Sequence, residues 1–172
     1  MATAEGFAVP PGYRVEIVEE NIIVSPARRG WEALNAETLA RELRGALANG
    51  LVAAEGIRLA LPETGQRYVP DVVVVPGFLF EGEDGAFPAN STVLVAEVSS
   101  PGMRETNRVK KLAGYVTAAV PHYLLVDRTE RTVSLFSGPD GRVYRRHLQV
   151  PFGEPVDLPA PFKGAINTAR FV

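Results

Sequence analysis

Three residues suited to metal and phosphate chemistry follow one another along the middle of the chain: Asp71, Glu97 and Lys111. Asp71 precedes a run of four valines, and Glu97 lies in the next apolar run, on the face expected for Val93 and Val95. A carboxylate in such surroundings is costly unless it is paired, hydrogen-bonded or bound to a metal. Two of them on successive strands suit one divalent cation, because Mg²⁺ is often held by one or two carboxylates.

A polar stripe on the helix predicted after Glu97 adds positive charge. Spacings of four, three and four residues place these side chains on one helix face: Arg104, Arg108, Lys111 and Tyr115. A neighbouring apolar stripe is expected to pack on the sheet: Val109, Leu112, Val116 and Val120. Lys111 is then a point charge available to a phosphate or a nucleophilic water. The alternatives are strand-end acids that meet solvent or an arginine, and a solvated basic helix face with one Glu–Lys ion pair.

The elements that must position these residues follow from hydrophobic periodicity. Strands are predicted over residues 13–19, 21–25, 57–61, 68–75, 92–99, 122–127, 132–136 and 143–148. Helices are predicted over residues 31–49, with Gly50 as the C-cap, and over residues 104–119. The remaining segments are predicted as a loose N-terminal arm (1–12), a loop (76–90) and an extended C-terminal tail (150–172). Because no linker divides residues 1–172, we expect a single α/β (α+β) domain with a central mixed sheet and two main helices.

Composition narrows the classes of function. The chain has 172 residues and no cysteine, which excludes disulfides, zinc–thiolate sites, iron–sulfur clusters and cysteine nucleophiles. A net charge of −2 gives no strong global field for polyanions. Only three of the 18 basic residues are lysines: Lys110, Lys111 and Lys163. Since the sequence shows no signal peptide and no long apolar stretch, we expect a cytoplasmic protein without membrane contact.

Other catalytic motifs are absent from the sequence. It contains no G-x-S-x-G elbow, no G-x-x-x-x-G-K-[ST] phosphate loop and no zincin histidine pair, and His122 is interpreted as structural. A basic run fits either a phosphate-contacting patch or a charged strand edge: Arg142, Arg145, Arg146 and His147. Arg28 and Arg29 leave the same two interpretations open. Trp31 is either a core anchor or a stacking platform for a base.

The ordered motifs resemble the PD-(D/E)XK nuclease superfamily, and within it a bacterial restriction-endonuclease branch whose catalytic lysine lies on the following helix. The motifs are PDVVVVP from Pro70, EVSSPGM from Glu97, KLAGY from Lys111 and AVPHYLLVD from Ala119. The similarity extends from about Tyr13 into the C-terminal tail. It implies a restriction-endonuclease-like mixed sheet flanked by helices, with additional N- and C-terminal strands.

The resemblance also implies a Mg²⁺- or Mn²⁺-dependent endonuclease that hydrolyses DNA phosphodiester bonds. Asp71 and Glu97 would hold the metal, with the Val98 carbonyl as a further ligand. Lys111 would be the catalytic lysine, in place of the parent motif's position at Ser99. Supporting roles are implied for Lys110, Tyr115, Ser100 and Glu16. For Glu16 the alternative is an outward-facing strand glutamate.

Two positions depart from the pattern of the branch. Trp31 stands where a histidine is frequent, and Asn107 stands where an aspartate is frequent. An alternative function therefore stays open, a catalytically weakened nuclease-like fold that serves as a nucleic-acid-binding or assembly module. A third is the hydrolysis of another phosphodiester. A homodimer is expected, because closed symmetric dimers are common and duplex cleavage needs two sites or two events.

Overall fold

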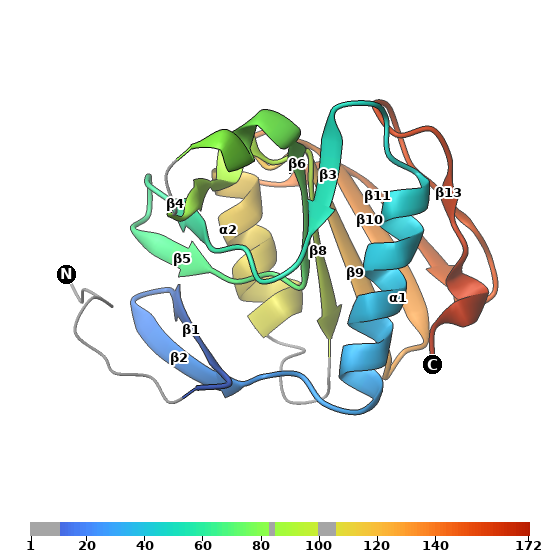
Figure 1. The fold of residues 1–172 in the computed structure, drawn as a ribbon, viewed down its shortest axis with the longest axis horizontal. Helices are drawn as coiled ribbons and strands as arrows, with labels where there is room; N and C mark the ends of the chain where they lie inside the picture. The colour runs from blue at the N-terminus through green and yellow to red at the C-terminus, as the bar shows by residue number, and fades with distance from the viewer. Residues whose placement is uncertain (1–10, 83–84, 100–105) are drawn as a thin grey trace.

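A six-stranded mixed sheet lies at the centre of the protein, seen in a computed structural model that describes residues 11–82, 85–99 and 106–172, without the side chains of 106–108 (Figure 1). Its strand order is β11-β10-β9-β8-β6-β3. The strands are β3 (Leu51–Ala54), β6 (Val72–Pro76), β8 (Leu94–Ser99), β9 (His122–Asp127), β10 (Thr132–Pro139) and β11 (Tyr144–Pro151). Strands β8 and β9 run parallel and the other neighbours run antiparallel, which confirms the predicted central mixed sheet.

A second, five-stranded sheet was not predicted. Its order is β2-β1-β5-β4-β7, and its strands are β1 (Tyr13–Val18), β2 (Asn21–Pro26), β4 (Leu59–Leu61), β5 (Gln66–Tyr68) and β7 (Phe87–Pro88). The single strand predicted over 68–75 is divided between the two sheets, since β5 ends at Tyr68 and β6 begins at Val72. Pro70 lies at the break and has no N–H for a ladder hydrogen bond. This crossing from one sheet to the other is where Asp71 lies.

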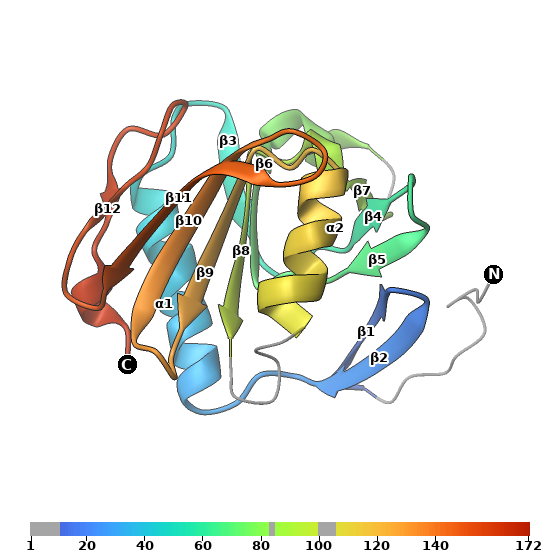
Figure 2. The same ribbon diagram turned by 180° about the vertical axis from the view of Figure 1, so that it is seen from behind.

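Helices cover opposite faces of the central sheet (Figures 1 and 2). Helix α1 (Trp31–Gly45) packs on one face, and the π-helical turn η4 (Thr106–Lys111) with α2 (Leu112–Thr117) covers the other. The valine run is buried on both faces, because Val72 and Val74 belong to the core beside α1 and Val73 and Val75 to the core beside α2. Helix α1 ends before the predicted residue 49, and Gly50 instead takes a φ of 79° in the turn before β3.

The predicted faces are wrong at two valines. Val93 precedes β8 and packs with the core beside α1, so only Val95 shares the Glu97 face. Val109 is 61 % exposed instead of packing on the sheet. The π-helical turn explains this, because hydrogen bonds from i to i+5 add a residue to the turn and rotate the side chains before it. Arg104 and the Arg108 side chain lie outside the described residues.

The C-terminal segment packs against α1. A short antiparallel pair, β12 (Val156–Asp157) and β13 (Ala165–Ile166), adds buried side chains to that core. The buried Asn35 of α1 donates to the carbonyl oxygen of Val172 at 2.6 Å and accepts from the Val172 N–H at 3.0 Å. The predicted extended tail therefore includes two short strands fixed to the helix. No helix among the described residues is long and apolar enough to cross a membrane.

Candidate active site

Asp71 and Glu97 lie at the same end of the central sheet because β6 and β8 are antiparallel. The last paired residues there are Val72 and Ala96. Asp71 and Glu97 each lie one residue beyond this pair. Asp71 Oδ2 accepts a hydrogen bond of 2.7 Å from the N–H of Val98, the residue after Glu97. The Asp71 side chain, only 2 % exposed, is thus tied to the strand that carries Glu97.

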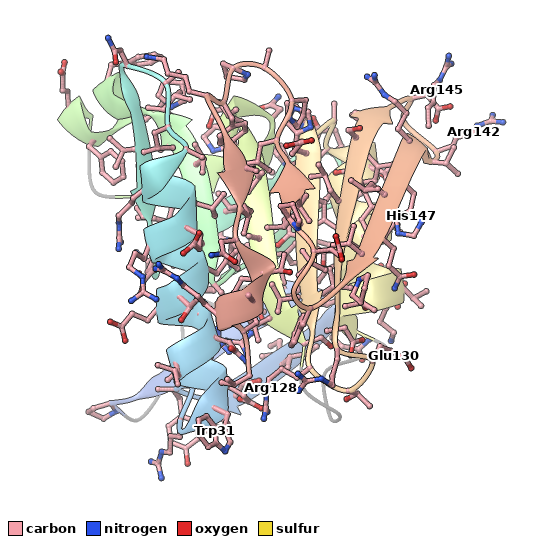
Figure 3. All side chains as sticks on the ribbon, turned by 90° about the vertical axis from the view of Figure 1, so that its right-hand side faces the viewer. Trp31, Arg128, Glu130, Arg142, Arg145 and His147 are labelled. Atoms are coloured by element: carbon pink, nitrogen blue, oxygen red, sulfur yellow. The ribbon has the colours of Figure 1, made fainter. Side chains whose placement is uncertain are left out.

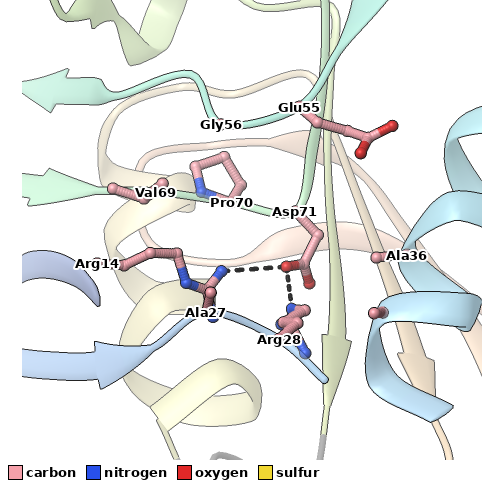
Figure 4. A pocket seen from close by; sticks show the side chains of 10 residues that line it. Arg14, Ala27, Arg28, Ala36, Glu55, Gly56, Val69, Pro70 and Asp71 are labelled. Atoms are coloured by element: carbon pink, nitrogen blue, oxygen red, sulfur yellow. Dashed lines mark hydrogen bonds and ion pairs between the residues drawn. The ribbon is translucent and has the colours of Figure 1, made fainter. Parts of the chain in front are cut away.

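Two arginines contact the other oxygen of Asp71. Arg14, from β1, places Nη1 3.2 Å from Asp71 Oδ1. Arg28, in the connection between β2 and α1, donates from Nε to the same oxygen (Figure 4). Arg28 also places Nη2 3.9 Å from Glu97 Oε2. One guanidinium group therefore contacts both of the predicted metal-binding carboxylates.

Lys111 lies on the opposite side of Glu97, between two acids. Its Nζ is 2.7 Å from Glu97 Oε1 and 2.7 Å from Glu16 Oε1, and the side chain is 1 % exposed. Tyr115 Oη donates to Glu97 Oε1 at 3.0 Å, and Glu16 Oε1 accepts from the Val69 N–H at 2.7 Å. The outward-facing alternative for Glu16 is wrong, since this side chain is buried and joins the same cluster.

The protonation of the cluster follows from burial and from neighbouring charges. Burial raises the pKa of Glu97 to about 7, with the charges of Asp71 and Glu16 adding to the rise and Lys111 and Arg28 opposing it. Burial acts to lower the pKa of Lys111, but the charges of Glu97 and Glu16 outweigh it and the pKa is raised. Lys111 is therefore an ammonium ion at neutral pH. Burial, and then Glu97, raise the pKa of Tyr115, so its phenol stays a hydrogen-bond donor.

Aromatic rings close the cluster on the α2 side. Tyr68 and Tyr115 meet edge to face with centroids 5.2 Å apart, and Lys111 Nζ is 5.7 Å from the Tyr68 centroid. Gly114 lies against Tyr68, where an added Cβ would collide with the phenol oxygen. The glycine of the KLAGY motif therefore lets Tyr68 approach the helix.

A cavity of about 320 Å³ leads to Asp71. Arg14 and Arg28 line it, together with Glu55 and small residues of α1 (Figure 4). Glu97 and Lys111 do not line this cavity. Within the described residues, the cavity reaches the cluster through Asp71, Arg14 and Arg28.

Other predicted site residues lie apart from the cluster or outside the described chain. Lys110 is partly exposed and pairs with Glu19 at 3.2 Å. Ser100 and the Asn107 side chain lie outside the described residues. Trp31 is 60 % exposed at the first position of α1, so the core-anchor interpretation is wrong (Figure 3).

Three residues of the predicted basic run, Arg145, Arg146 and His147, lie on β11, the edge strand of the central sheet, and Arg142 lies in the turn before it. Arg142 and Arg145 are exposed at the end of the molecule opposite Trp31 (Figure 3). Arg145 pairs with Asp140 at 3.3 Å, and the His147 ring stacks on Phe136 with centroids 4.2 Å apart. This placement agrees with a charged strand edge. His122 is half-buried near the ring of Phe162, which agrees with a structural role.

Two members of the site were missed from the sequence, Arg14 and Tyr68. Arg14 precedes Glu16 by two positions in a predicted strand, and side chains two apart lie on one face. That alternation could have placed Arg14 beside the acids. Tyr68 gave no such signal, because its contact depends on the break between β5 and β6.

A mixed sheet flanked by helices, with two acids and a lysine gathered at one end, defines a restriction-endonuclease-like protein of the PD-(D/E)XK superfamily. The Uma2 family model, described as "Putative restriction endonuclease", matches residues 4–169, and the chain belongs to this family. A crystal structure from Anabaena variabilis, described as a "putative nuclease belonging to DUF820", is similar with a TM-score of 0.67 and 18 % identity, covering 85 % of this chain and 82 % of that one. A comparison with curated proteins gave no match. The predicted superfamily and fold class are confirmed.

Proposed function

We propose that the protein is a Mg²⁺- or Mn²⁺-dependent endonuclease that hydrolyses DNA phosphodiester bonds at Asp71, Glu97 and Lys111. The observation that carries the proposal is the shared guanidinium of Arg28, which contacts Asp71 Oδ1 and lies 3.9 Å from Glu97 Oε2. Two carboxylate oxygens on different strands thus face one positive charge. Membership in a nuclease family supports a nucleic-acid substrate.

The donor set fits a hard divalent cation. No group of three or more acidic or histidine side chains with metal-binding spacing occurs in the part of the chain that the structure describes. Mg²⁺ nevertheless needs only one or two carboxylates, since water and substrate oxygens complete its coordination. The Arg28 guanidinium serves here as a stand-in cation between the two acids. A bound metal would polarise the scissile phosphate and lower the pKa of a water.

In each acid, one carboxylate oxygen is held by other groups of the cluster, and the second oxygen points toward Arg28. Asp71 uses Oδ2 to accept from the Val98 N–H and directs Oδ1 at Arg28. Glu97 uses Oε1 to bind Lys111 and Tyr115, which leaves Oε2 on the Arg28 side. Held in this way, the two oxygens on the Arg28 side already face a positive charge, which is the advantage of a preorganised site.

The Val98 carbonyl is the third ligand that we propose. Paired residues of an antiparallel ladder exchange both hydrogen bonds, so the N–H and C=O of one residue point to the same side. Because the Val98 N–H reaches Asp71, we expect its carbonyl to face the space beyond the start of β6 as well. That space lies beside the proposed cation position.

Lys111 has two roles in this proposal. Two of the three ammonium protons are directed at Glu97 and Glu16, which fixes Glu97. We propose that the third proton orients water or stabilises charge that develops on the phosphate. Arg14 and Arg28 supply positive charge to the cavity, where a phosphate would bind. Tyr115 supports Glu97, and Lys110 and Ser100 stay predicted supporting groups.

Plasmid cleavage with Mg²⁺ or Mn²⁺ tests the proposal. We expect Asp71→Asn, Glu97→Gln and Lys111→Met each to lose cleavage by about 10²-fold or more. Asp157→Asn is the matched control, because Asp157 is exposed on β12 and does not line the cavity. Full activity of all three site variants would refute the assignment.

Metal calorimetry separates the endonuclease from the binding-module alternative. The module is favoured by the two departures from the pattern of the branch, Trp31 and Asn107. Mn²⁺ binding that is lost in Asp71→Asn supports the metal-dependent enzyme. DNA binding without any metal binding supports the module. The cytoplasmic location and the homodimer stay predictions from the sequence.

A further inference from the structure

Arg28 contacts three acidic side chains from one largely covered position. Its side chain is 11 % exposed, and it donates from Nε to Asp71 and lies 3.9 Å from Glu97. On its remaining side, Nη1 is 3.9 Å from Oε2 of Glu32, one turn later at the start of α1. The first two acids are almost fully buried, whereas the Glu32 side chain is 33 % exposed.

We infer that Arg28 is a displaceable counter-cation: its guanidinium neutralises Asp71 and Glu97 in the metal-free protein and moves to Glu32 when a divalent metal binds. The inference rests on the proposed function for the metal itself. It makes Arg28 a positioning residue for which the acid pair and Glu32 compete. It also predicts that this competition sets the metal affinity.

The charge balance explains why a counter-cation is needed. Three buried acids meet three basic side chains in the cluster: Glu16, Asp71 and Glu97 with Arg14, Arg28 and Lys111. Two carboxylates facing each other in a buried site repel unless a positive charge lies between them. A metal ion and a guanidinium cannot both occupy the space between Asp71 Oδ1 and Glu97 Oε2, so one must displace the other.

Glu32 is the partner that can receive the displaced group. It is already within ion-pair distance, and its partial exposure leaves room for the guanidinium to rotate toward solvent. Arg14 does not offer the same movement. The ion pair described for it is with Asp71, and its Nε is buried without a hydrogen-bond partner among the described residues.

The movement would also open the site. Arg28 lines the cavity that leads to Asp71, and Glu97 does not. With Arg28 turned to Glu32, Glu97 Oε2 faces the cavity, where metal and substrate enter. The guanidinium stays on the cavity wall near the place proposed for the phosphate.

Calorimetric Mn²⁺ titration of the full chain tests this competition through Kd, independently of cleavage. For Arg28→Gln we expect Mn²⁺ to bind about tenfold more tightly, since a charge-assisted hydrogen bond no longer opposes it. For Glu32→Gln we expect weaker binding than in the wild type, because the displaced guanidinium loses its second partner. The double variant should match Arg28→Gln. Arg145→Gln, which removes an exposed ion pair with Asp140 outside the cavity, is the control and should leave Kd unchanged.

A second measurement follows Arg28 directly. The Arg28 Nε–H resonance of the intact protein should shift during a Mg²⁺ titration and saturate at the calorimetric Kd, while the Arg145 resonance stays fixed. This readout needs no Arg28 variant, so it survives if Arg28→Gln does not fold.

The outcomes separate the two proposals. Metal binding in the wild type with an unchanged or weaker affinity in Arg28→Gln overturns the role of Arg28 and leaves the proposed function intact. A stationary Arg28 resonance during metal binding does the same. No metal binding in any variant overturns the metal-dependent function, and the displacement with it.

Discussion

Glu16 in β1 holds the ammonium group of Lys111 at 2.7 Å, and Glu97 holds it at the same distance from β8. Lys111 is therefore fixed between two strands that belong to different sheets. Because all three side chains are buried, the pairing is sensitive to the size and charge of each partner.

Lys111→Arg should reduce cleavage by about 10²-fold, although it conserves the charge. A planar guanidinium cannot replace a compact ammonium between two carboxylates without moving Glu97. The measurement is the initial rate of plasmid nicking with Mg²⁺. Lys163→Arg is the control, because Lys163 is exposed and its Nζ donates to Asn49 Oδ1 at 3.3 Å, far from the cluster in the sequence. Equal rates for the wild type and Lys111→Arg would contradict the prediction.

Lys111→Met should lower the free energy of unfolding by about 3–5 kcal/mol at neutral pH. The cause is the pair of buried carboxylates, Glu16 and Glu97, that would lose their shared cation. Urea denaturation of the metal-free protein measures the change. Arg145→Gln should leave the stability nearly unchanged, because its ion pair with Asp140 is exposed. A similar loss of stability in Lys111→Met and Arg145→Gln would contradict the prediction that Glu16 and Glu97 are especially costly to bury without their shared cation.

Gly114→Ala should destabilise the protein by about 1–3 kcal/mol, because the new Cβ meets the buried Tyr68 ring. Displacing Tyr68 also disturbs Lys111, whose Nζ lies 5.7 Å from that ring. Gly45→Ala is a matched control at the end of α1, where nothing lies within 4 Å of an added Cβ. The control should be neutral or stabilising, since alanine favours helix. Thermal unfolding distinguishes the two, and equal midpoints would exclude the predicted collision.

His122 should make the protein less stable as the pH falls below the ordinary histidine value of 6.5. Burial lowers the pKa of His122, the Ala160 backbone opposes this, and Arg146 adds to the lowering. The unfolded chain therefore takes up a proton before the folded chain does, so stability rises with pH through this window. His122→Asn should flatten that part of the urea stability profile, and an unchanged slope would contradict the assignment.

The fold could be predicted where hydrophobic periodicity decides it. β9 has the predicted bounds, and the alternating valines of β6 have both faces buried as expected. The second sheet could not be predicted, because strands as short as Leu59–Leu61 and Gln66–Tyr68 carry little periodicity. The packing predicted for Val109 was wrong for a related reason. The π-helical turn before Lys111 does not follow the spacing of an α-helix.

The site could be predicted as residue types, with a Glu–Lys ion pair and an acid–arginine contact among the alternatives, but its full set of contacts could not. Acids in apolar strands, helix spacing and motif order together point to Asp71, Glu97 and Lys111, and the structure brings their side chains into one cluster whose catalytic role is still a prediction. The pairing of Arg28 with both acids was not predictable, because it depends on the path between β2 and α1. Long-range placement of a loop arginine leaves no periodic signal in the sequence.

The cluster has a consequence for how the protein becomes active. Its contacts join residues far apart in the chain, for example 43 positions between Arg28 and Asp71 and 53 between Glu16 and Val69. Contacts of such separation form only after long loops have closed, which is the slow part of folding. No short fragment of the chain can contain the complete site. Any activity at these residues should therefore emerge late in folding.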